Sequence, residues 1–208
     1  NEISVDETTK KPKNPMINAG AIAAVSLIPA RSPQERFDMI AEFYSAFAGR
    51  RLELDRDVYA SEKAIGSRNR AIAYMLQSFG VLDDDPDEVL DVYFRQCSFN
   101  VTATDLARMA ATLARGGVNP LTGRRVTNAG VVKRTLSVMV TCGMYDAAGD
   151  WVSAVGMPAK SGVGGGIVAV LPGQLGIGCT RRYSTPRATA CAEFACAAAC
   201  PSNSALTS

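Results

Sequence analysis

The sequence predicts an α+β fold, because helix signals fill most of the chain before Trp151 and strand signals appear only after it. The helix signals are apolar residues spaced three and four apart, with capping residues at the starts of the segments. The strand signals are short apolar runs, two of which are joined by the turn Pro172-Gly173. This segregation predicts a helical region packed on an antiparallel sheet, since a parallel sheet would require alternating strands and helices.

The segment from Ser32 to Gly49 illustrates the helix criteria. Ser32-Pro33-Gln34-Glu35 is a capping box with proline at the first helical position, and Gly49 suits a helix end. The same criteria predict helices at 15–27, at 32–48, in one or two pieces over 55–80, at 85–97, at 102–115 and at 131–142. Strands are predicted at 157–161, 166–171 and 174–178, and because they alternate poorly we expect both faces of the sheet to be covered.

The composition is that of an ordinary globular domain, with 208 residues of which 47% are hydrophobic and 20% charged. The net charge of +2 and the lack of a dense Lys/Arg run argue against a nucleic-acid partner. We interpret Lys10-Lys11-Pro12-Lys13 as a solvated loop. The longest apolar run, residues 19–30, is too short to span a bilayer, so no membrane partner is expected.

Histidine is absent from the sequence. Ser-His-Asp and Cys-His catalysis are therefore excluded within these residues. Any zinc site would depend on cysteine and carboxylate ligands. The cysteines at 191, 196 and 200 fit no zinc-ligand spacing, and we expect no metal there.

Four segments carry a family resemblance: 14–22 (NPMINAGAI), 68–69 (RN), 142–146 (CGMYD) and 160–167 (KSGVGGGI). The last is a Lys-Ser-Gly element followed by glycines, of the kind that lines the active site of serine–lysine acyl-transfer enzymes. Together, over residues 1–178, they resemble the bacterial glutaminases, which hydrolyse L-glutamine to L-glutamate and ammonia. The resemblance implies the fold of β-lactamases and transpeptidases, without its N-terminal strands and without its last strand and helix.

The resemblance implies three residues that bind a free amino acid. Glu62 matches the family's glutamate for the α-ammonium, and Asn18 and Asn69 match asparagines that hold the polar groups of the substrate. Taken without the motifs, the same residues would be interpreted as a solvated helical glutamate, a capping asparagine and a surface asparagine.

The resemblance also implies residues near the reacting amide. Tyr93 would orient the side-chain amide, and Tyr145 would shuttle a proton between the serine and the leaving ammonia. Val163 would supply a backbone N–H to the oxyanion hole, because the surrounding glycines let the backbone approach the substrate. Lys160 carries the Lys-Ser-Gly resemblance without a defined role.

The catalytic Ser-x-x-Lys pair of such enzymes is missing from the sequence, since no serine has a lysine three residues on. Thr8 with Lys11 has this spacing but lies in a polar loop. By the resemblance the pair belongs before Asn1, so we expect residues 1–178 to be a partial glutaminase domain that is inactive by itself.

Residues 179–208 differ in character from the rest, with four of the six cysteines and no periodic apolar pattern. Back-translation with GC-rich codons, with one guanine restored before Cys179, gives a string beginning VYSPLLDAAGNSVRG, which resembles the way glutaminases end. We therefore predict a frameshifted tail without fixed structure. The alternative is a genuine disordered tail.

The resulting hypothesis is a glutaminase that acts through a serine acyl-enzyme in the complete protein, as a cytoplasmic homotetramer, with no metal or organic cofactor implied. Two alternatives stay open. The chain can be a non-catalytic glutamine-binding fragment or pseudoenzyme, or it can be a β-lactamase-like or peptidase-like hydrolase.

Overall fold

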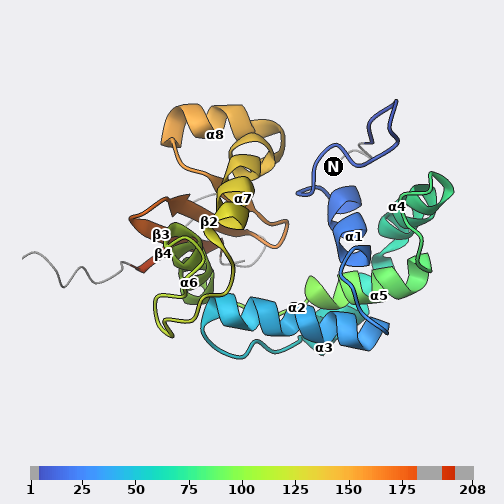
Figure 1. Ribbon diagram of the computed structural model, residues 1–208, viewed down its shortest axis with the longest axis horizontal. Helices are drawn as coiled ribbons and strands as arrows, with labels where there is room; N and C mark the ends of the chain where they lie inside the picture. The colour runs from blue at the N-terminus through green and yellow to red at the C-terminus, as the bar shows by residue number, and fades with distance from the viewer. Residues whose placement is uncertain (1–4, 182–193, 200–208) are drawn as a thin grey trace, which may run out of the picture. The chain divides into compact units, whose positions relative to one another are not determined.

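The computed structural model describes residues 5–181 and 194–199 and divides the chain into two compact units (Figure 1). Unit 1 comprises residues 1–44 and 52–100, and unit 2 comprises residues 45–51 and 101–208. In the described residues unit 1 is built from helices, whereas unit 2 combines helices with one antiparallel sheet. The predicted α+β class is therefore confirmed.

Unit 1 contains the helices α1 (Asn18–Ser26), most of α2 (Pro33–Ala48), α3 (Arg56–Ile65), α4 (Ser67–Ser78) and α5 (Pro86–Gln96). Aspartate side chains accept backbone N–H groups at the starts of α3 and α5, where they also suit the helix dipole. Helix α1 packs against α4 and α5. Their shared core is largely apolar and includes Ile22, Leu76, Leu90, Val92 and Phe94, each at most 1% exposed.

Unit 2 contains α6 (Ala103–Ala114), α7 (Ala129–Cys142), the 3₁₀ turn η1 (Tyr145–Ala147) and α8 (Ala148–Val155). Its strands are β1 (Ala159–Ser161), β2 (Gly166–Leu171), β3 (Leu175–Arg181) and β4 (Phe194–Ala199). They form one antiparallel sheet in the order β1-β2-β3-β4.

Helix α6 lies on the sheet over β3 (Figure 1). Two glycines of β3 make this contact possible. A Cβ at Gly176 would lie 2.0 Å from the backbone nitrogen of Ala111, and one at Gly178 would lie 2.2 Å from that of Ala107. The helix backbone therefore packs directly on the strand backbone, which any side chain at these two positions would prevent.

The predicted helices and the first three strands are confirmed, with small shifts at their ends. Helix α8 was not predicted, and the coverage of both sheet faces stays a prediction. Helix α6 covers one face, and on the opposite face Ala159 and Ala169 are buried while Ile167 and Ile177 are half-buried. Of the tail, Cys179–Arg181 end β3 and Phe194–Ala199 form β4, while 182–193 and 200–208 lie outside the described residues. The frameshift itself stays a prediction.

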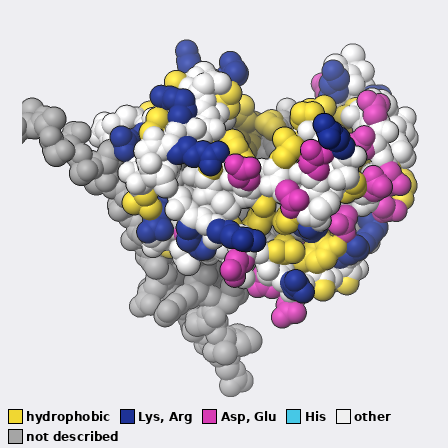
Figure 2. Space-filling view, turned by 60° about the horizontal axis from the view of Figure 1, so that its bottom comes forward, with side chains coloured by type: hydrophobic (Ala, Val, Ile, Leu, Met, Phe, Trp, Pro, Cys, Tyr) yellow, Lys and Arg dark blue, Asp and Glu magenta, His cyan; other side chains and the backbone are white. Residues whose placement is uncertain are grey.

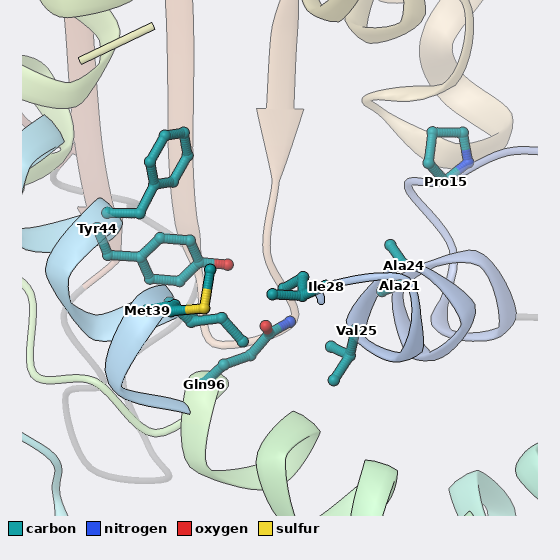
Figure 3. A pocket seen from close by; sticks show the side chains of 10 residues that line it. Pro15, Ala21, Ala24, Val25, Ile28, Met39, Tyr44 and Gln96 are labelled. Carbon is teal, nitrogen blue, oxygen red and sulfur yellow. The ribbon is translucent and has the colours of Figure 1, made fainter. Parts of the chain in front are cut away.

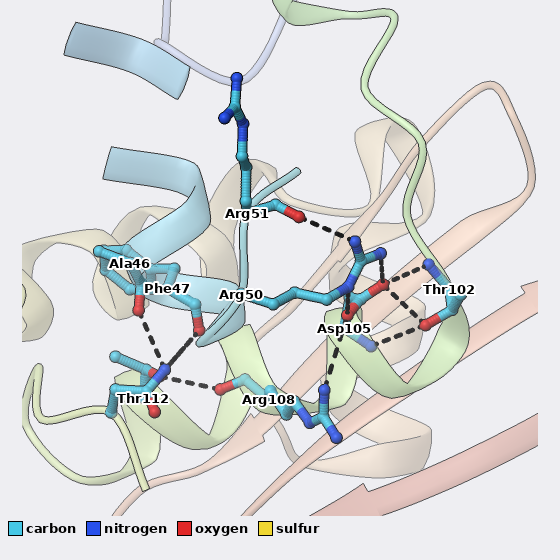
Figure 4. Close-up of polar contacts among 9 residues, drawn as sticks. Ala46, Phe47, Arg50, Arg51, Thr102, Asp105, Arg108 and Thr112 are labelled. Atoms are coloured by element: carbon cyan, nitrogen blue, oxygen red, sulfur yellow. Dashed lines mark hydrogen bonds and ion pairs between the residues drawn. The ribbon is translucent and has the colours of Figure 1, made fainter. Parts of the chain in front are cut away.

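A buried carboxylate joins the segment after α2 to the start of α6 (Figure 4). The Asp105 side chain is 1% exposed and accepts hydrogen bonds from Nε and Nη2 of Arg50, at 2.8 and 2.6 Å. It also accepts from the backbone and hydroxyl of Thr102, which completes a capping box at the start of α6. Further along, the Thr112 hydroxyl donates to the Phe47 carbonyl.

The charges are unevenly distributed over the two units. Of the acidic residues only Asp105, Asp146, Asp150 and Glu193 belong to unit 2, so unit 1 is acidic and unit 2 is basic. On the described part of the face drawn in Figure 2, Lys and Arg side chains lie among apolar, acidic and neutral ones without a continuous basic patch. Among the described helices, none has the length and apolar character that a membrane span requires.

Candidate active site

The first candidate residue, Asn18, is placed by the loop that precedes α1. Asn14 Oδ1 accepts the backbone N–H of Met16 at 2.9 Å, which turns the loop back toward the helix. A Cβ at Gly20 would lie 2.0 Å from the Asn14 carbonyl oxygen, so only glycine lets the loop lie against α1. Asn18 is then the first residue of α1, and its Nδ2 donates to Oδ1 of Asn69 on α4 at 2.9 Å. Both asparagines are half-buried.

Glu62 near the end of α3 and Asn69 near the start of α4 flank Gly66, where the chain packs closely against α5. A Cβ at Gly66 would lie 2.4 Å from Cζ of Phe94 on α5, so the two helices meet directly over that ring. Glu62 lies in the last turns of α3, half-buried, and Tyr93 on α5 is 7% exposed.

Glu62 and Tyr93 both influence Cys97, which lies just after α5. Desolvation raises the pKa of the Cys97 thiol to about 11. A side-chain hydrogen bond with Tyr93 opposes this rise, and the negative charge of Glu62 adds to it. Both candidate residues therefore lie within interaction range of one sulfur atom.

A polar cluster holds α3 against α5 one turn away from Glu62. The Tyr59 hydroxyl donates to Asp91 Oδ1 at 2.5 Å, and Lys63 Nζ donates to the same oxygen at 2.6 Å. Desolvation opposes ionisation of Asp91, but the hydrogen bonds from Lys63 and Tyr59 lower the pKa of its carboxyl group. The hydrogen bond to Asp91 in turn raises the pKa of Lys63. Tyr59 thus links α3 to α5 through its hydroxyl group.

In unit 2, the loop containing Tyr145 is attached to strand β1 through backbone contacts. A Cβ at Gly143 would lie 1.8 Å from the Ala159 carbonyl oxygen, and the Ser161 N–H donates to the Gly143 carbonyl at 3.1 Å. This attachment brings Tyr145 beside Lys160, whose Nζ lies 4.3 Å from the centre of the tyrosine ring. The two residues belong to separate sequence motifs, and nothing in the sequence indicated that they touch.

Val163 lies at the tip of the turn between β1 and β2. The Gly162 N–H donates to the Gly166 carbonyl at 2.7 Å, and the Gly165 N–H donates to the Gly162 carbonyl at 3.0 Å. These bonds close the turn and leave Val163 78% exposed. None of the hydrogen bonds between described residues uses the Val163 N–H. This group is therefore free to donate to a ligand.

The structure thus joins Asn18 to Asn69, and Glu62 and Tyr93 both influence Cys97; all of these residues belong to unit 1, while Tyr145 and Val163 belong to unit 2. The sequence did not predict that Lys160 contacts Tyr145, although both residues lie in segments that carry the family resemblance.

A cavity of about 480 Å³ in unit 1 lies elsewhere (Figure 3). It lies between α1 and α2, and its lining is apolar apart from Gln96 and the tyrosine Tyr44. None of the candidate residues lines it, and no charged side chain does. A free amino acid carries two charges, so this cavity is a poor site for one.

Helices packed on an antiparallel sheet, with a Lys-Ser-Gly strand beside a tyrosine, define a protein of the β-lactamase-like class. Within that class the chain belongs to the glutaminase family, whose model matches residues 1–184.

Curated relatives and solved structures support this assignment. The chain is 54% identical over 178 residues to a glutaminase of Microcystis aeruginosa, covering 86% of this chain and 53% of the relative. It is 59% identical over 168 residues to glutaminase 2 of Bradyrhizobium diazoefficiens, covering 81% and 27%. The structure of Mglu in its glutamate form matches with a TM-score of 0.81 and 49% identity, covering 86% of this chain and 41% of that one. The chain spans about half the length, or less, of these relatives.

Proposed function

We propose that the protein hydrolyses L-glutamine to L-glutamate and ammonia, and that the part of it present here supplies the binding groups for glutamine. The observation that carries this proposal is the contact between Asn18 and Asn69, which joins two segments of family resemblance into one polar site. Membership of the glutaminase family supports the substrate. The Mglu structure in its glutamate form supports an amino acid of this class as the ligand.

In this proposal the candidate residues of unit 1 recognise the free amino acid. Glu62 pairs with the α-ammonium group, because an ammonium in a half-buried site requires a carboxylate partner. Asn18 and Asn69 bind the remaining polar groups of the substrate, and their mutual hydrogen bond holds both amides in place before the ligand arrives. Tyr93 is buried and orients the side-chain amide.

The chemical step is acyl transfer to a serine. The serine hydroxyl attacks the side-chain amide carbonyl, ammonia leaves with a proton delivered through Tyr145, and water then hydrolyses the glutamyl ester. The exposed N–H of Val163 stabilises the oxyanion of each tetrahedral intermediate. The 208 residues contain no Ser-x-x-Lys pair. We therefore expect them, assayed alone, to bind glutamine without hydrolysing it.

The test is calorimetric titration of the 208-residue chain with L-glutamine, with D-glutamine as the control ligand, alongside an assay of glutamate release. We expect binding of L-glutamine at about millimolar affinity, weakened by Glu62→Gln and by Asn69→Ala. Glutamate release should not exceed that of a Tyr145→Phe variant. Equal heats for the two enantiomers, or affinity unchanged in both variants, would contradict the assignment of the site.

The proposal extends to the assembly and location of the protein, which we place in the cytoplasm as a homotetramer. Sedimentation of the purified chain at several concentrations tests the assembly, and fractionation of the source cells tests the location. A monomer at all concentrations, or recovery from a secreted fraction, would contradict them.

A further inference from the structure

Tyr145 has an uncommon backbone conformation. Its φ angle is +54°, in the left-handed region that bulky residues rarely adopt. Such a conformation costs free energy and persists only where the surroundings hold it. Here they do, because Gly143 is pressed against Ala159 and the Ser161 N–H donates to the Gly143 carbonyl. The strained backbone therefore aims one particular side chain at the side of strand β1.

The ammonium of Lys160 lies over the face of that ring, 4.3 Å from its centre, which is within the range of a cation–π interaction. The same ammonium donates to the Ser161 carbonyl. Among the salt bridges of the described residues, none gives Lys160 a carboxylate partner. Desolvation lowers the pKa of Lys160, so its position is costly for a cation. The Ser161 carbonyl and the Tyr145 ring are the groups that offset this cost.

The contact leaves the phenol group available. Lys160 lies over the ring face, and none of the hydrogen bonds between described residues involves the Tyr145 hydroxyl. A cation on the face therefore restrains the ring without occupying the atom that would move a proton. Proton transfer requires the donor and the acceptor to be held within hydrogen-bond reach. Restraint of the Tyr145 ring would hold its hydroxyl group in such a position.

We propose that Lys160 is a positioning residue for Tyr145: its ammonium, held by the Ser161 carbonyl, lies over the tyrosine ring and fixes the direction of the phenol hydroxyl. The catalytic significance of this contact rests on the proposed function of Tyr145, whereas the contact itself can be tested without substrate.

The experiment is ¹⁹F NMR of the full 208-residue chain labelled with 3-fluorotyrosine. The chain contains six tyrosines, and Tyr145→Phe identifies the signal of Tyr145 by its loss. In the unsubstituted chain we expect this signal to be displaced from the random-coil position and broadened by restraint. Lys160→Met should move it to the random-coil position and sharpen it. Lys160→Arg should retain the displaced signal, because a guanidinium also lies over aromatic rings.

Two controls separate positioning from stability. Lys133→Met removes an exposed lysine of the same unit and should leave every tyrosine signal unchanged. Lys160→Gln removes the charge but keeps a polar side chain, and should act like Lys160→Met on Tyr145 while the signals of Tyr44, Tyr59, Tyr74 and Tyr93 stay in place.

Three outcomes would overturn the proposal. The first is a Tyr145 signal that stays displaced in both Lys160→Met and Lys160→Gln. The second is a Tyr145 signal that moves to the random-coil position in Lys160→Arg as well. The third is a move of all tyrosine signals to their random-coil positions in both charge-removing variants, which would show that Lys160 is needed for folding rather than for positioning Tyr145. A failure of glutamine to bind the chain would instead contradict the proposed function and leave these signals as expected.

Discussion

Asn18 and Asn69 are separated by 51 positions in the sequence and are joined by a hydrogen bond of 2.9 Å between their side-chain amides. The bond spans two helices, α1 and α4, that pack on each other in the core of unit 1. Each amide has further donor and acceptor capacity beyond this bond. In the proposed function the pair therefore offers polar groups that are held in place before the ligand binds.

Replacing Asn69 with alanine should weaken L-glutamine binding at least about tenfold, which corresponds to about 1.4 kcal/mol. In the proposed function the substitution removes one ligand contact, and it also frees Asn18 from its partner. Isothermal titration calorimetry measures the loss. The control is Asn100→Ala, an exposed asparagine of the same unit that is not a candidate site residue, which should bind like the unsubstituted chain. Equal losses in the two variants would contradict the assignment.

Replacing Asp105 with asparagine should lower the free energy of unfolding by about 2 kcal/mol, because hydrogen bonds to a charged group are lost on a buried side chain. Urea unfolding monitored by circular dichroism measures the change. Asp150→Asn, at an exposed position of α8, should change stability by less than about 0.5 kcal/mol. Similar midpoints for the two variants would show that the Arg50–Asp105 pair contributes little.

The contribution of Asp105 should also depend on pH. The hydrogen bonds from Arg50, and then those from Thr102, hold the pKa of this carboxyl well below its usual range despite desolvation. A depressed pKa stabilises the folded state above the unfolded value of about 3.9, and the contribution is lost as the pH falls toward the folded value. The difference in stability between the unsubstituted chain and Asp105→Asn should therefore be constant from pH 5 to 7 and shrink below about pH 4. A difference that grows on acidification would have the wrong sign.

Gly143→Ala should destabilise unit 2 by at least about 2 kcal/mol, because the new methyl group would overlap the Ala159 carbonyl oxygen. It should also displace the ¹⁹F signal of Tyr145, since the contact of Gly143 with β1 places that residue. Gly149→Ala is the matched control. Its Cβ meets no atom within 4 Å and it lies in α8, so it should leave stability unchanged or raise it slightly. Thermal unfolding and the NMR spectrum together distinguish the two variants.

Most helices were predictable because their signals are local. Asp55, Asp85 and Thr102 each cap the helix that they precede, and the apolar spacing that follows requires only neighbouring residues. Helix α8 was not predicted because its local signals are weak. Its first residue follows Ala147, which makes no side-chain capping bond, and Gly149 lies inside it, so the local signal for a helix is weak.

By itself the sequence determined the α+β class, the order of the elements and the segments that carry the family resemblance. The first two follow from local residue patterns, and the last follows from the residues of short motifs. Only the tertiary structure decided that Asn18 meets Asn69, that Arg50 binds Asp105 and that Lys160 covers Tyr145. Such contacts depend on how closely two backbones approach. That approach is set at single glycines, such as Gly66 against Phe94 and Gly143 against Ala159. A sequence shows where these glycines are, but not which atoms lie opposite them.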